Sequence, residues 1–462
     1  MGLGHGVVVG GSIAGLTAAR ALSESFDRIT IVERDELPNG IEHRRGVPQA
    51  KQLHVILPLG AEIMEEFFPG FKQELSEAGC STFDEVKDTP WFGRQGWRAR
   101  RDSDVTLIGF RRPLLEHVIR ERVRAIGNIE FLTGAVTGLQ STDDHSRVTG
   151  ATFIDGATNA PATLEAELVV DASGRGSRSP KWLEQLGYER PLEQHVRAYY
   201  GYASRFVAVD EERLPDGLRG VITMPFPGST RGGCFLPSDN GLYTCCAMGA
   251  MRDYPPAEEE AFMEFLREAP SPLLAQMAEL AEPVTEINTY HHPGNQRRLW
   301  EEMPRRPRGF IPVGDAVASF NPIYGQGMTV AAFEAQKLRD RIATTGGDLD
   351  ALPDAFMEDL TAACEFPFSI AAGNDANYPG ASFINAQPPP PENAEFFALA
   401  EQLATEDPDV ARDILHATGW FEAELLASPE LVAKVQDWVA SGQQVTNNDP
   451  TRVREPVSPQ PA

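Results

Sequence analysis

The segment from Gly6 to Glu33, GVVVGGSIAGLTAARALSESFDRITIVE, decides the fold. It begins with an apolar run that ends in glycines, continues as a helix-like stretch of small and apolar residues, and ends in a β-type run, Arg28–Glu33. A strand, a glycine-rich turn, a helix and a second strand form a compact βαβ unit. The segment therefore predicts a Rossmann-like α/β domain at the start of the chain.

The turn of this unit predicts a dinucleotide site. Gly10, Ser12 and Gly15 occupy the fixed positions of G-x-G-x-x-G, with serine at the middle one. The first glycine permits a tight turn, the middle position lies close to a pyrophosphate, and the last lets helix and strand pack closely. Serine is a small replacement whose hydroxyl can bond to phosphate. Glu33 ends the next strand, where a carboxylate can accept hydrogen bonds from an adenosine ribose. Because the fingerprint occurs once, we expect one permanently bound dinucleotide.

A second informative segment, RGFIPVGDAVASFNPIYGQGMTVA, spans residues 308–331. Its apolar run ends in Gly314-Asp315, a loop containing Gly325 and Gly327 follows, and an apolar-periodic helix comes next. A carboxylate at a strand end can bind a polyol, and glycines let the backbone approach a flat ring. A helix N-terminus adds free N–H groups and a positive dipole end. The segment predicts the ring half of a flavin site, although alone it also fits an ordinary strand–loop–helix.

Composition limits the partners. The 462 residues carry 41 Lys+Arg against 67 Asp+Glu, a net charge of −26. Such an acidic surface argues against general binding to nucleic acid or anionic membranes. No run approaches the ~18 apolar residues of a membrane span, and no secretory signal is apparent, so we expect a soluble, cytoplasmic protein without a membrane span.

The five cysteines predict neither a metal site nor a redox couple, since they form no CxxC pair. Cys245 and Cys246 lie in a strand-like run, Leu242–Met248, where neighbours face opposite ways. We expect them to be half-buried small hydrophobes.

Changes in pattern along the chain predict several parts. They are an FAD-binding domain in three pieces (1–82, 102–190 and 296–345), an excursion to a substrate domain (83–101), a substrate-binding sheet domain (191–295), a C-terminal helical region (346–446) and a disordered tail (447–462). A polyproline run at 387–391 reads as a stiff linker. The predicted fold class is therefore α/β, with a Rossmann-like FAD-binding domain of the glutathione-reductase type, an inserted β-sheet domain and a C-terminal helical region.

Five motifs in order carry a family resemblance that spans roughly residues 5–345. They are Gly10–Gly15 with Glu33, Arg45–Gln49 with His54, Arg112–Glu116, Asp171–Ser177, and Gly314–Met328. In this order the chain resembles the FAD-dependent aromatic-hydroxylase-like (group A) monooxygenases. The sequences RGVPQ, GRGS and FNPIYGQGM are most similar to the bacterial polyketide and polyene epoxidases and hydroxylases of secondary metabolism.

The resemblance implies an activity and its cofactors. It implies an oxidoreductase with non-covalent FAD that inserts one oxygen atom of O2 through a flavin C4a-hydroperoxide. The substrate would be an apolar, polyketide-like intermediate of antibiotic biosynthesis, free or bound to a carrier protein, and the reaction an epoxidation or a hydroxylation. Electrons would come from NADPH, NADH or a separate flavin reductase. Pro180 stands where the family often has an arginine, which leaves NAD(P)H docking open, with Arg175 and Arg178 nearby.

The resemblance also implies site residues. Ser12 and Arg112 would bind the pyrophosphate, Asp315 the ribityl chain, and Pro322–Met328 the isoalloxazine. Arg45 and Gln49 would lie near the adenine or the ring. No catalytic side chain is assigned, because flavin C4a carries the chemistry, and no metal is expected. The expected cofactor-binding positions are Gly10, Ser12, Ile13, Ala14, Gly15, Glu33, Arg34, Arg45, Gln49, Arg112, Asp171, Gly174, Gly314, Asp315, Pro322, Gly325, Gly327 and Met328.

Alternatives remain within the same fold. One is a non-redox cyclase of the [4+2] type that keeps FAD as a scaffold, and another is a flavin-dependent prenyl reductase. A third is a non-enzymatic binder, against which the intact flavin motifs argue. The residues Trp91, Phe92, Trp97, Phe235 and Met248 are candidates for an apolar pocket, although core packing is the commoner fate of such side chains. Oligomeric state and substrate identity stay open.

Overall fold

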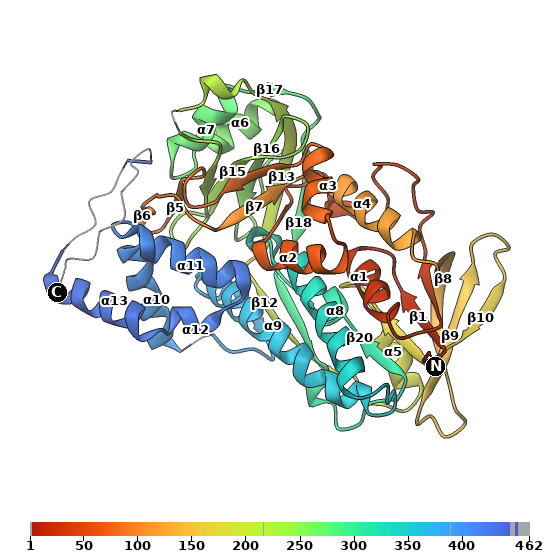
Figure 1. Ribbon diagram of the computed structural model, residues 1–462. Helices are drawn as coiled ribbons and strands as arrows, with labels where there is room; N and C mark the ends of the chain where they lie inside the picture. The colour runs from red at the N-terminus through yellow and green to blue at the C-terminus, as the bar shows by residue number, and fades with distance from the viewer. Residues whose placement is uncertain (1, 216, 389, 444–448, 451–462) are drawn as a thin grey trace.

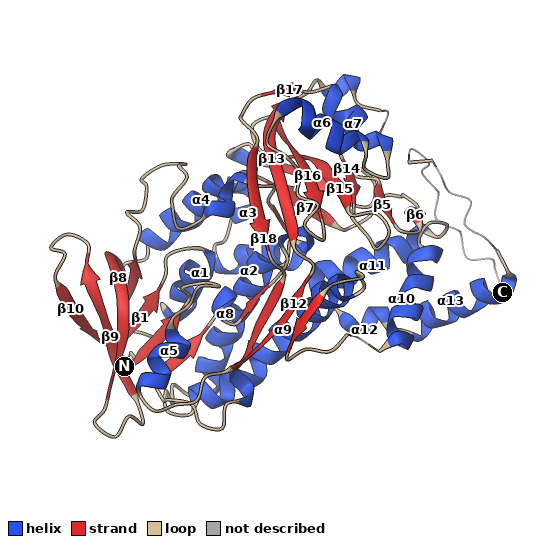
Figure 2. Cartoon of the chain, turned by 180° about the vertical axis from the view of Figure 1, so that it is seen from behind, coloured by secondary structure: helices blue, strands red, loops and turns tan. Residues whose placement is uncertain are grey.

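The computed structural model describes residues 2–215, 217–388, 390–443 and 449–450. A mainly parallel sheet with its helices lies at one end, a mainly antiparallel eight-stranded sheet lies above it, and the C-terminal helices extend to one side (Figure 1). Figure 2 shows the same three parts from behind. The predicted tail, 447–462, falls outside the described residues except for 449 and 450.

The parallel sheet carries the N-terminal unit. Its strand order is β10-β9-β8-β2-β1-β11-β20, in which β8, β2, β1, β11 and β20 run parallel and β9 and β10 extend one edge antiparallel. The central residues Val7 and Val8 are fully buried, as strands covered on both faces require. The strands are β1 (His5–Val9), β2 (Arg28–Glu33), β8 (Ile129–Ser141), β9 (Val148–Asp155), β10 (Pro161–Glu165), β11 (Leu168–Asp171) and β20 (Phe310–Pro312).

Helices from both ends of the chain pack on this sheet. α1 (Ile13–Leu22) contacts α8 (Gly327–Thr344) and α4 (Arg112–Arg124), while α8 also contacts α2 (Pro58–Phe67) and α9 (Leu352–Ala376). The βαβ unit is confirmed, with α1 beginning at Ile13. Residues 55–56 form β3, and α2 begins at Pro58, a proline in the position that helix starts prefer. Two short helices are α3 (Phe71–Glu77) and α5 (Ser179–Gln185).

The eight-stranded sheet has the order β17-β13-β16-β15-β14-β5-β6, with β18 also paired to β13. Residues 91–97 of the predicted excursion contribute β5 and β6 to it. Helices α6 (Glu259–Arg267) and α7 (Pro272–Glu279) pack against β15. The strands are β5 (Trp91–Gly93), β6 (Gly96–Trp97), β13 (Tyr200–Ala208), β14 (Val221–Thr223), β15 (Arg231–Pro237), β16 (Leu242–Gly249), β17 (Glu282–Pro283) and β18 (Asn288–His292).

This sheet corrects one expectation about the cysteines. Cys245 and Cys246 are fully buried rather than half-buried. They do face opposite ways, because Cys245 packs in the cluster that includes α6 and α7, whereas Cys246 packs with tyrosines and aliphatic side chains on the other face. Among the described residues all five cysteines are free, and no group of side chains has the composition of a metal site.

Two smaller sheets join the parts. One has the order β21-β19-β12-β22, and the other β3-β7-β4. Their strands are β12 (Leu192–Arg197), β19 (Asn295–Leu299), β21 (Ala318–Ser319), β22 (Ser382–Ile384), β3 (Val55–Ile56), β4 (Ser81–Asp84) and β7 (Thr106–Gly109). β12 takes its partners β19 and β22 from segments more than 80 residues away, so this sheet ties the C-terminal region to the rest.

After α9, the C-terminal region contains α10 (Pro391–Leu403), α11 (Pro408–Trp420), α12 (Ala423–Leu426) and α13 (Pro429–Ser441). The predicted polyproline linker ends where Pro391 opens α10. In the described part of the chain, no helix combines the length and apolarity that crossing a bilayer demands.

Candidate functional site

A cavity of about 1070 Å³ lies where the three parts meet. The N-terminal unit lines it with Gly10 and Ser12, and the segment after β20 lines it with the loop at residues 321–327, here called the ring loop. The eight-stranded sheet and the C-terminal helices supply the remaining walls, for example Tyr202 and Tyr378. The two segments that the sequence singled out therefore line one cavity.

The glycine turn is built for close packing. Gly10 has φ +106°, and a Cβ there would lie 2.5 Å from the carbonyl oxygen of Ala172, next to β11. A Cβ on Gly15 would lie only 1.8 Å from the carbonyl oxygen of Gly10. Neither position accepts a side chain without moving backbone, which is the physical basis of the fingerprint. Gly15 itself does not line the cavity.

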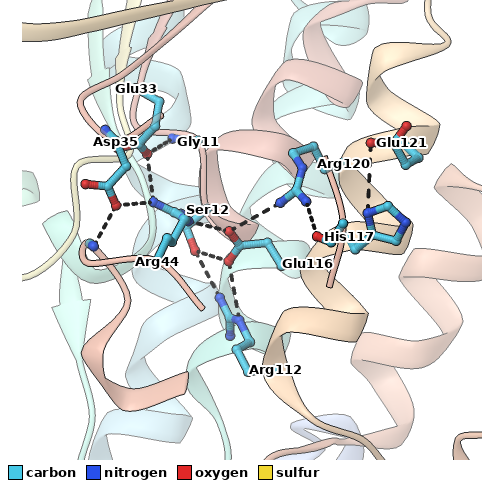
Figure 3. Close-up of polar contacts among 12 residues, drawn as sticks. Gly11, Ser12, Glu33, Asp35, Arg44, Arg112, Glu116, His117, Arg120 and Glu121 are labelled. Carbon is cyan, nitrogen blue, oxygen red and sulfur yellow. Dashed lines mark hydrogen bonds and ion pairs between the residues drawn. The ribbon is translucent and has the colours of Figure 1, made fainter. Parts of the chain in front are cut away.

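A cluster of charged side chains surrounds Ser12 (Figure 3). Arg112 Nη2 donates to Ser12 Oγ at 3.0 Å, and Ser12 Oγ donates to Glu116 Oε2 at 3.1 Å. Arg44 Nε donates to Glu116 Oε1 at 2.6 Å. Arg112 Nε and Arg44 Nη2 are buried without a hydrogen-bond partner. Two guanidinium groups thus face the turn, each with an N–H group that is free to donate a hydrogen bond. A pyrophosphate needs such donors for its oxygens.

The charge balance of this cluster is reflected in its pKa shifts. Burial lowers the pKa of Arg112, and Arg44 lowers it too, against the opposing effect of Glu116. Burial also acts to lower the pKa of Arg44, but Glu116 and Glu33 outweigh it and the pKa is raised. Both guanidinium groups remain charged at neutral pH, because the ordinary pKa of arginine lies far above 7.

Glu33 lies at the end of β2, as expected, and lines the cavity. Its Oε2 accepts the Gly11 N–H at 2.8 Å and lies 3.3 Å from Arg44 Nη1, and its Oε1 accepts the Asp35 N–H at 3.0 Å. These bonds fix the carboxylate beside the turn.

Sequence reasoning chose Arg45 for the cofactor, and the structure brings Arg44 into the cavity instead. Arg45 is exposed and does not line the cavity. Arg44 is only 7% exposed in its side chain and pairs with Glu33, Asp35 and Glu116. The two neighbours point apart, and a sequence pattern alone does not tell which of them points inward.

The Asp171–Ser177 segment holds its own shape. The Asp171 carboxylate is fully buried and accepts hydrogen bonds from Ser173 N (3.0 Å) and from the hydroxyls of Ser173, Ser177 and Ser179 (2.5 Å each). Asp171 therefore does not reach the cavity, whereas Gly174 and Arg175 line it.

On the ring side, Asp315 lines the cavity and Gly314 lies behind it. Burial raises the pKa of Asp315, although Ser319, Arg175 and Arg112 lower it. Gly314 has φ +63°, a Cβ there would lie 2.7 Å from the Cβ of Ala14, and its N–H donates to Glu334 Oε2 at 2.5 Å. This close approach packs the start of the ring segment directly onto α1.

The ring loop leads into α8 through Gly325, whose φ is +67°. Asn321 caps the turn at 322–324, with Oδ1 accepting the Ile323 N–H at 3.4 Å. Gln326 Oε1 is buried without a partner at the start of α8. The loop thus places one acceptor without a partner, Gln326 Oε1, and the N–H groups of a helix N-terminus beside the cavity. These groups match a ring edge that carries both hydrogen-bond donors and acceptors.

Sequence reasoning missed a group of polar residues behind the ring loop. Asp375 on α9 is fully buried and accepts from Asn295, Asn321 and Tyr324. Tyr202 OH donates to Asn321 Oδ1 at 2.5 Å. A polar residue on an otherwise apolar helix face was the available signal, but nothing in the sequence says that α9 packs against this loop.

Tyrosines and neutral imidazoles also line the cavity wall. Burial raises the pKa of Tyr200, Tyr202 and Tyr290, so their hydroxyls stay protonated. Burial and then Arg112 lower the pKa of His54 to about 3, and burial and then Arg175 lower that of His292 to about 3. These groups serve as hydrogen-bonding partners, and none is tuned to remove a proton near neutral pH.

Apolar side chains complete this wall, among them Ile222, Met224 and Leu236. Of the five aromatic and small candidates named from the sequence, Trp91 and Met248 line the cavity. Trp97 and Phe235 are buried in the core between the eight-stranded sheet and its helices, and Phe92 packs against that core.

Fourteen of the expected cofactor positions line the cavity and four do not. Those that line it are Gly10, Ser12, Ile13, Ala14, Glu33, Arg34, Gln49, Arg112, Gly174, Asp315, Pro322, Gly325, Gly327 and Met328; those that do not are Gly15, Arg45, Asp171 and Gly314. Guanidinium donors lie beside the glycine turn, one carboxylate ends β2 and another follows β20, and glycines approach the far end. The residues present therefore fit FAD.

Comparisons with known proteins agree with this geometry. Residues 5–347 match the family described as an FAD binding domain. Protein Rv3254 of Mycobacterium tuberculosis (strain ATCC 25618 / H37Rv) is 33% identical over 377 residues, which cover 79% of this chain and 78% of that protein.

Two solved structures share the fold. The p-nitrophenol 4-monooxygenase PnpA from Pseudomonas putida DLL-E4 has 19% identity and a TM-score of 0.61, with 92% of this chain and 98% of that chain covered. The Diels-Alderase PyrE3, from the biosynthetic pathway of pyrroindomycins, has 16% identity and a TM-score of 0.57, with 90% and 80% covered. At such identities the likeness is one of fold.

Proposed function

Because the chain belongs to the FAD-binding-domain family, that of the aromatic-hydroxylase-like (group A) flavoprotein monooxygenases, we propose that it inserts one oxygen atom of O2 into an apolar natural-product intermediate. The observation that carries the proposal is the single cavity that runs from Ser12 and Arg112, past the ring loop, to the apolar face of the eight-stranded sheet. A cofactor and a second molecule can meet inside it.

The cofactor half of the site would bind FAD through complementary charge. Arg112 and Arg44 would hold the pyrophosphate with the donors they have free, Glu33 the adenosine ribose, and Asp315 the ribityl chain. When bound, the flavin supplies the redox and oxygen chemistry. The ring loop and the first turn of α8 would place N–H groups and a positive dipole end beside the ring, where negative charge is stabilised.

The substrate half would orient the second molecule and exclude water. Its wall combines Ile222, Met224 and Leu236 with Tyr200 and Tyr202. An apolar molecule with a few carbonyl or hydroxyl oxygens matches such a wall better than a small, strongly polar aromatic. The C-terminal helices cover the cavity from the side through Ile370, Phe397 and Leu415, which supports a bulky polyketide- or terpenoid-like substrate.

The acid–base inventory bears on the type of reaction. Removing a phenolic proton calls for a base with a pKa near neutrality, and the cavity-facing imidazoles of His54 and His292 have a pKa of about 3. Oxygen transfer to an alkene needs no such base. Glu85 also lines the cavity, and burial raises its pKa to about 7, so the cavity does contain a group of this kind. The site therefore accommodates epoxidation and hydroxylation alike, in secondary metabolism.

The test begins with the purified protein and its bound chromophore. We expect a yellow protein whose flavin is bleached by NADPH, by NADH or by a separate flavin reductase, with dithionite as the chemical reductant if none of these acts. In air the colour should return, and one oxygen atom of 18O2 should be incorporated into an apolar polyene or polyketide. Conversion of substrate without bleaching would instead support the non-redox cyclase, and saturation of a prenyl chain without incorporation would support the reductase. A colourless protein that binds no added FAD would overturn both halves of the proposal.

A further inference from the structure

The buried carboxyl of Asp375 has an unusual set of partners. Asn295 Nδ2 donates to Oδ2 at 2.9 Å, Tyr324 OH donates to Oδ1 at 3.0 Å, and Asn321 Nδ2 lies 3.1 Å from both oxygens. All of these donors are neutral. Among the residues that the structure describes, no cation pairs with Asp375, although a buried carboxylate is ordinarily matched by one.

These bonds join three parts of the molecule. Asp375 lies on α9, Asn295 on β19, and Asn321 and Tyr324 on the ring loop. Asn295 closes a second contact, because its Oδ1 accepts the Asn321 backbone N–H at 2.7 Å. The conformation of the ring loop therefore depends on a side chain that the C-terminal helical region supplies.

The eight-stranded sheet reaches the same group through Tyr202. Its hydroxyl donates to Asn321 Oδ1 at 2.5 Å and accepts the Ile323 N–H at 3.2 Å. Tyr200 on the same strand donates to the hydroxyl of Tyr378 at 3.1 Å. Tyr378 lies three residues after Asp375, just past the end of α9. A change at the carboxyl can thus reach both the ring loop and the substrate wall.

We propose that Asp375 is a positioning residue that holds the ring loop against the flavin, and that gain or loss of its proton shifts the loop and the environment of the ring. The inference rests on FAD binding and not on oxygen transfer. In the ionised state both oxygens accept from the three donors. In the neutral state the carboxyl carries a proton of its own, so the bonds from Asn321 and Tyr324 rearrange.

The surroundings support a proton that is lost near pH 7. Burial raises the pKa of Asp375 to about 7, against the lowering effect of its hydrogen bonds. Among the described residues, the other titratable groups that face it are four tyrosines: Tyr200 and Tyr202 on β13, Tyr324 on the ring loop and Tyr378 just after the end of α9. Burial raises the pKa of each, so they stay neutral across the physiological range, and β19 contributes only the amide of Asn295.

The experiment is a pH titration of the visible absorbance and reduction potential of the FAD-loaded protein between about pH 5.5 and 8.5. We expect the wild type to show a one-proton change with a midpoint near 7. Asp375→Asn is expected to bind FAD and lose this change. Asp359→Asn is the matched control, because it alters a carboxylate on the same helix that pairs with Arg341 away from the cavity, and it should titrate like the wild type.

A second pair of variants keeps the test decisive if Asp375→Asn does not fold. Tyr324→Phe removes one donor to the anion, so the midpoint should move to higher pH. Glu334→Gln alters the other buried carboxyl near this segment, whose pKa burial raises to about 8, and should leave the midpoint in place. A flat wild-type titration, an unchanged titration in Asp375→Asn, or loss of the midpoint in Glu334→Gln would each overturn the proposal. Oxygen transfer failing while the titration persists would count against the proposed function alone.

Discussion

The two halves of the cavity stabilise buried polar groups in opposite ways. Around Ser12, Arg44 and Arg112 are matched by Glu33 and Glu116, so charge is met by charge. Around the ring loop, the described partners of Asp375 are amides and a tyrosine hydroxyl. An ion-paired cluster keeps its charges over a wide pH range, whereas a buried carboxyl among neutral donors gains or loses a proton at a small cost in free energy. The first half suits permanent binding of a phosphate group, and the second suits a response to conditions.

The largest expected effect breaks the phosphate half outright. Gly15→Ala places a Cβ about 1.8 Å from the Gly10 carbonyl oxygen, so α1 must move away from β1. We expect loss of bound FAD and a destabilisation of about 3 kcal/mol or more, as for other strained backbone substitutions. Flavin absorbance per protein and thermal unfolding measure it. Gly127→Ala is the control, since nothing lies within 4 Å of its added Cβ, and equal damage there would refute the steric argument.

A smaller effect removes one charge from the same half. Arg112→Met deletes the guanidinium group beside Ser12 and leaves Glu116 with one cation fewer. A charge-assisted hydrogen bond contributes about 1.5–3 kcal/mol, so we expect FAD affinity to fall about 10- to 100-fold with the fold retained. Fluorescence titration of the apoprotein with FAD measures this. Arg45→Ala should change affinity far less than Arg44→Ala, and the reverse order would restore the assignment made from the sequence.

These two predictions concern the half that sequence reasoning could find. Gly10, Ser12, Gly15 and Glu33 are close in sequence and have a fixed spacing, because one βαβ unit holds them all. The family and the α/β class follow from the same pattern, and the family match confirms them. Arg44 could not be separated from Arg45, since a loop without periodicity does not reveal which side chain turns inward.

The ring half was predictable only in part. The order of Gly314, Asp315 and the ring loop follows from local sequence, and the structure brings most of these positions to the cavity. The residues that fix the loop from behind come from β13, β19 and α9, which are up to about 180 residues apart. Contacts of that range depend on packing between domains and leave no local pattern.

A prediction with an intermediate expected effect tests the half of the cavity around the ring loop, where Asp375 has neutral hydrogen-bond partners. Tyr202→Phe removes the hydroxyl that donates to Asn321 and accepts from the Ile323 N–H. Leaving these buried groups unsatisfied costs about 1–3 kcal/mol. We expect a lower unfolding temperature and a shifted flavin spectrum, with FAD affinity within about tenfold of the wild type. Loss of affinity as large as in Arg112→Met would erase the contrast between the halves.

The remaining prediction concerns the pH dependence of stability. Burial raises the pKa of Glu334 to about 8, far above that of an unfolded glutamate, so the folded state holds a proton that the unfolded state releases. Linkage then lowers stability as pH rises from about 4.5 to 8. In Glu334→Gln this slope is absent. The difference in unfolding temperature between variant and wild type should therefore shift in favour of the variant with rising pH, and a constant difference would contradict the assignment.

The separation of the two halves along the chain also affects how the protein is synthesised. β11 lies between β1 and β20, so its outer edge has no partner until residues 310–312 have been translated. At about 5–20 residues per second, the roughly 140 residues between β11 and β20 take about 7–28 s to make. During that interval an unpaired, apolar strand edge is open to wrong partners. The yield of soluble protein should therefore rise at low growth temperature or with added chaperones, which protect this edge until β20 has joined the sheet.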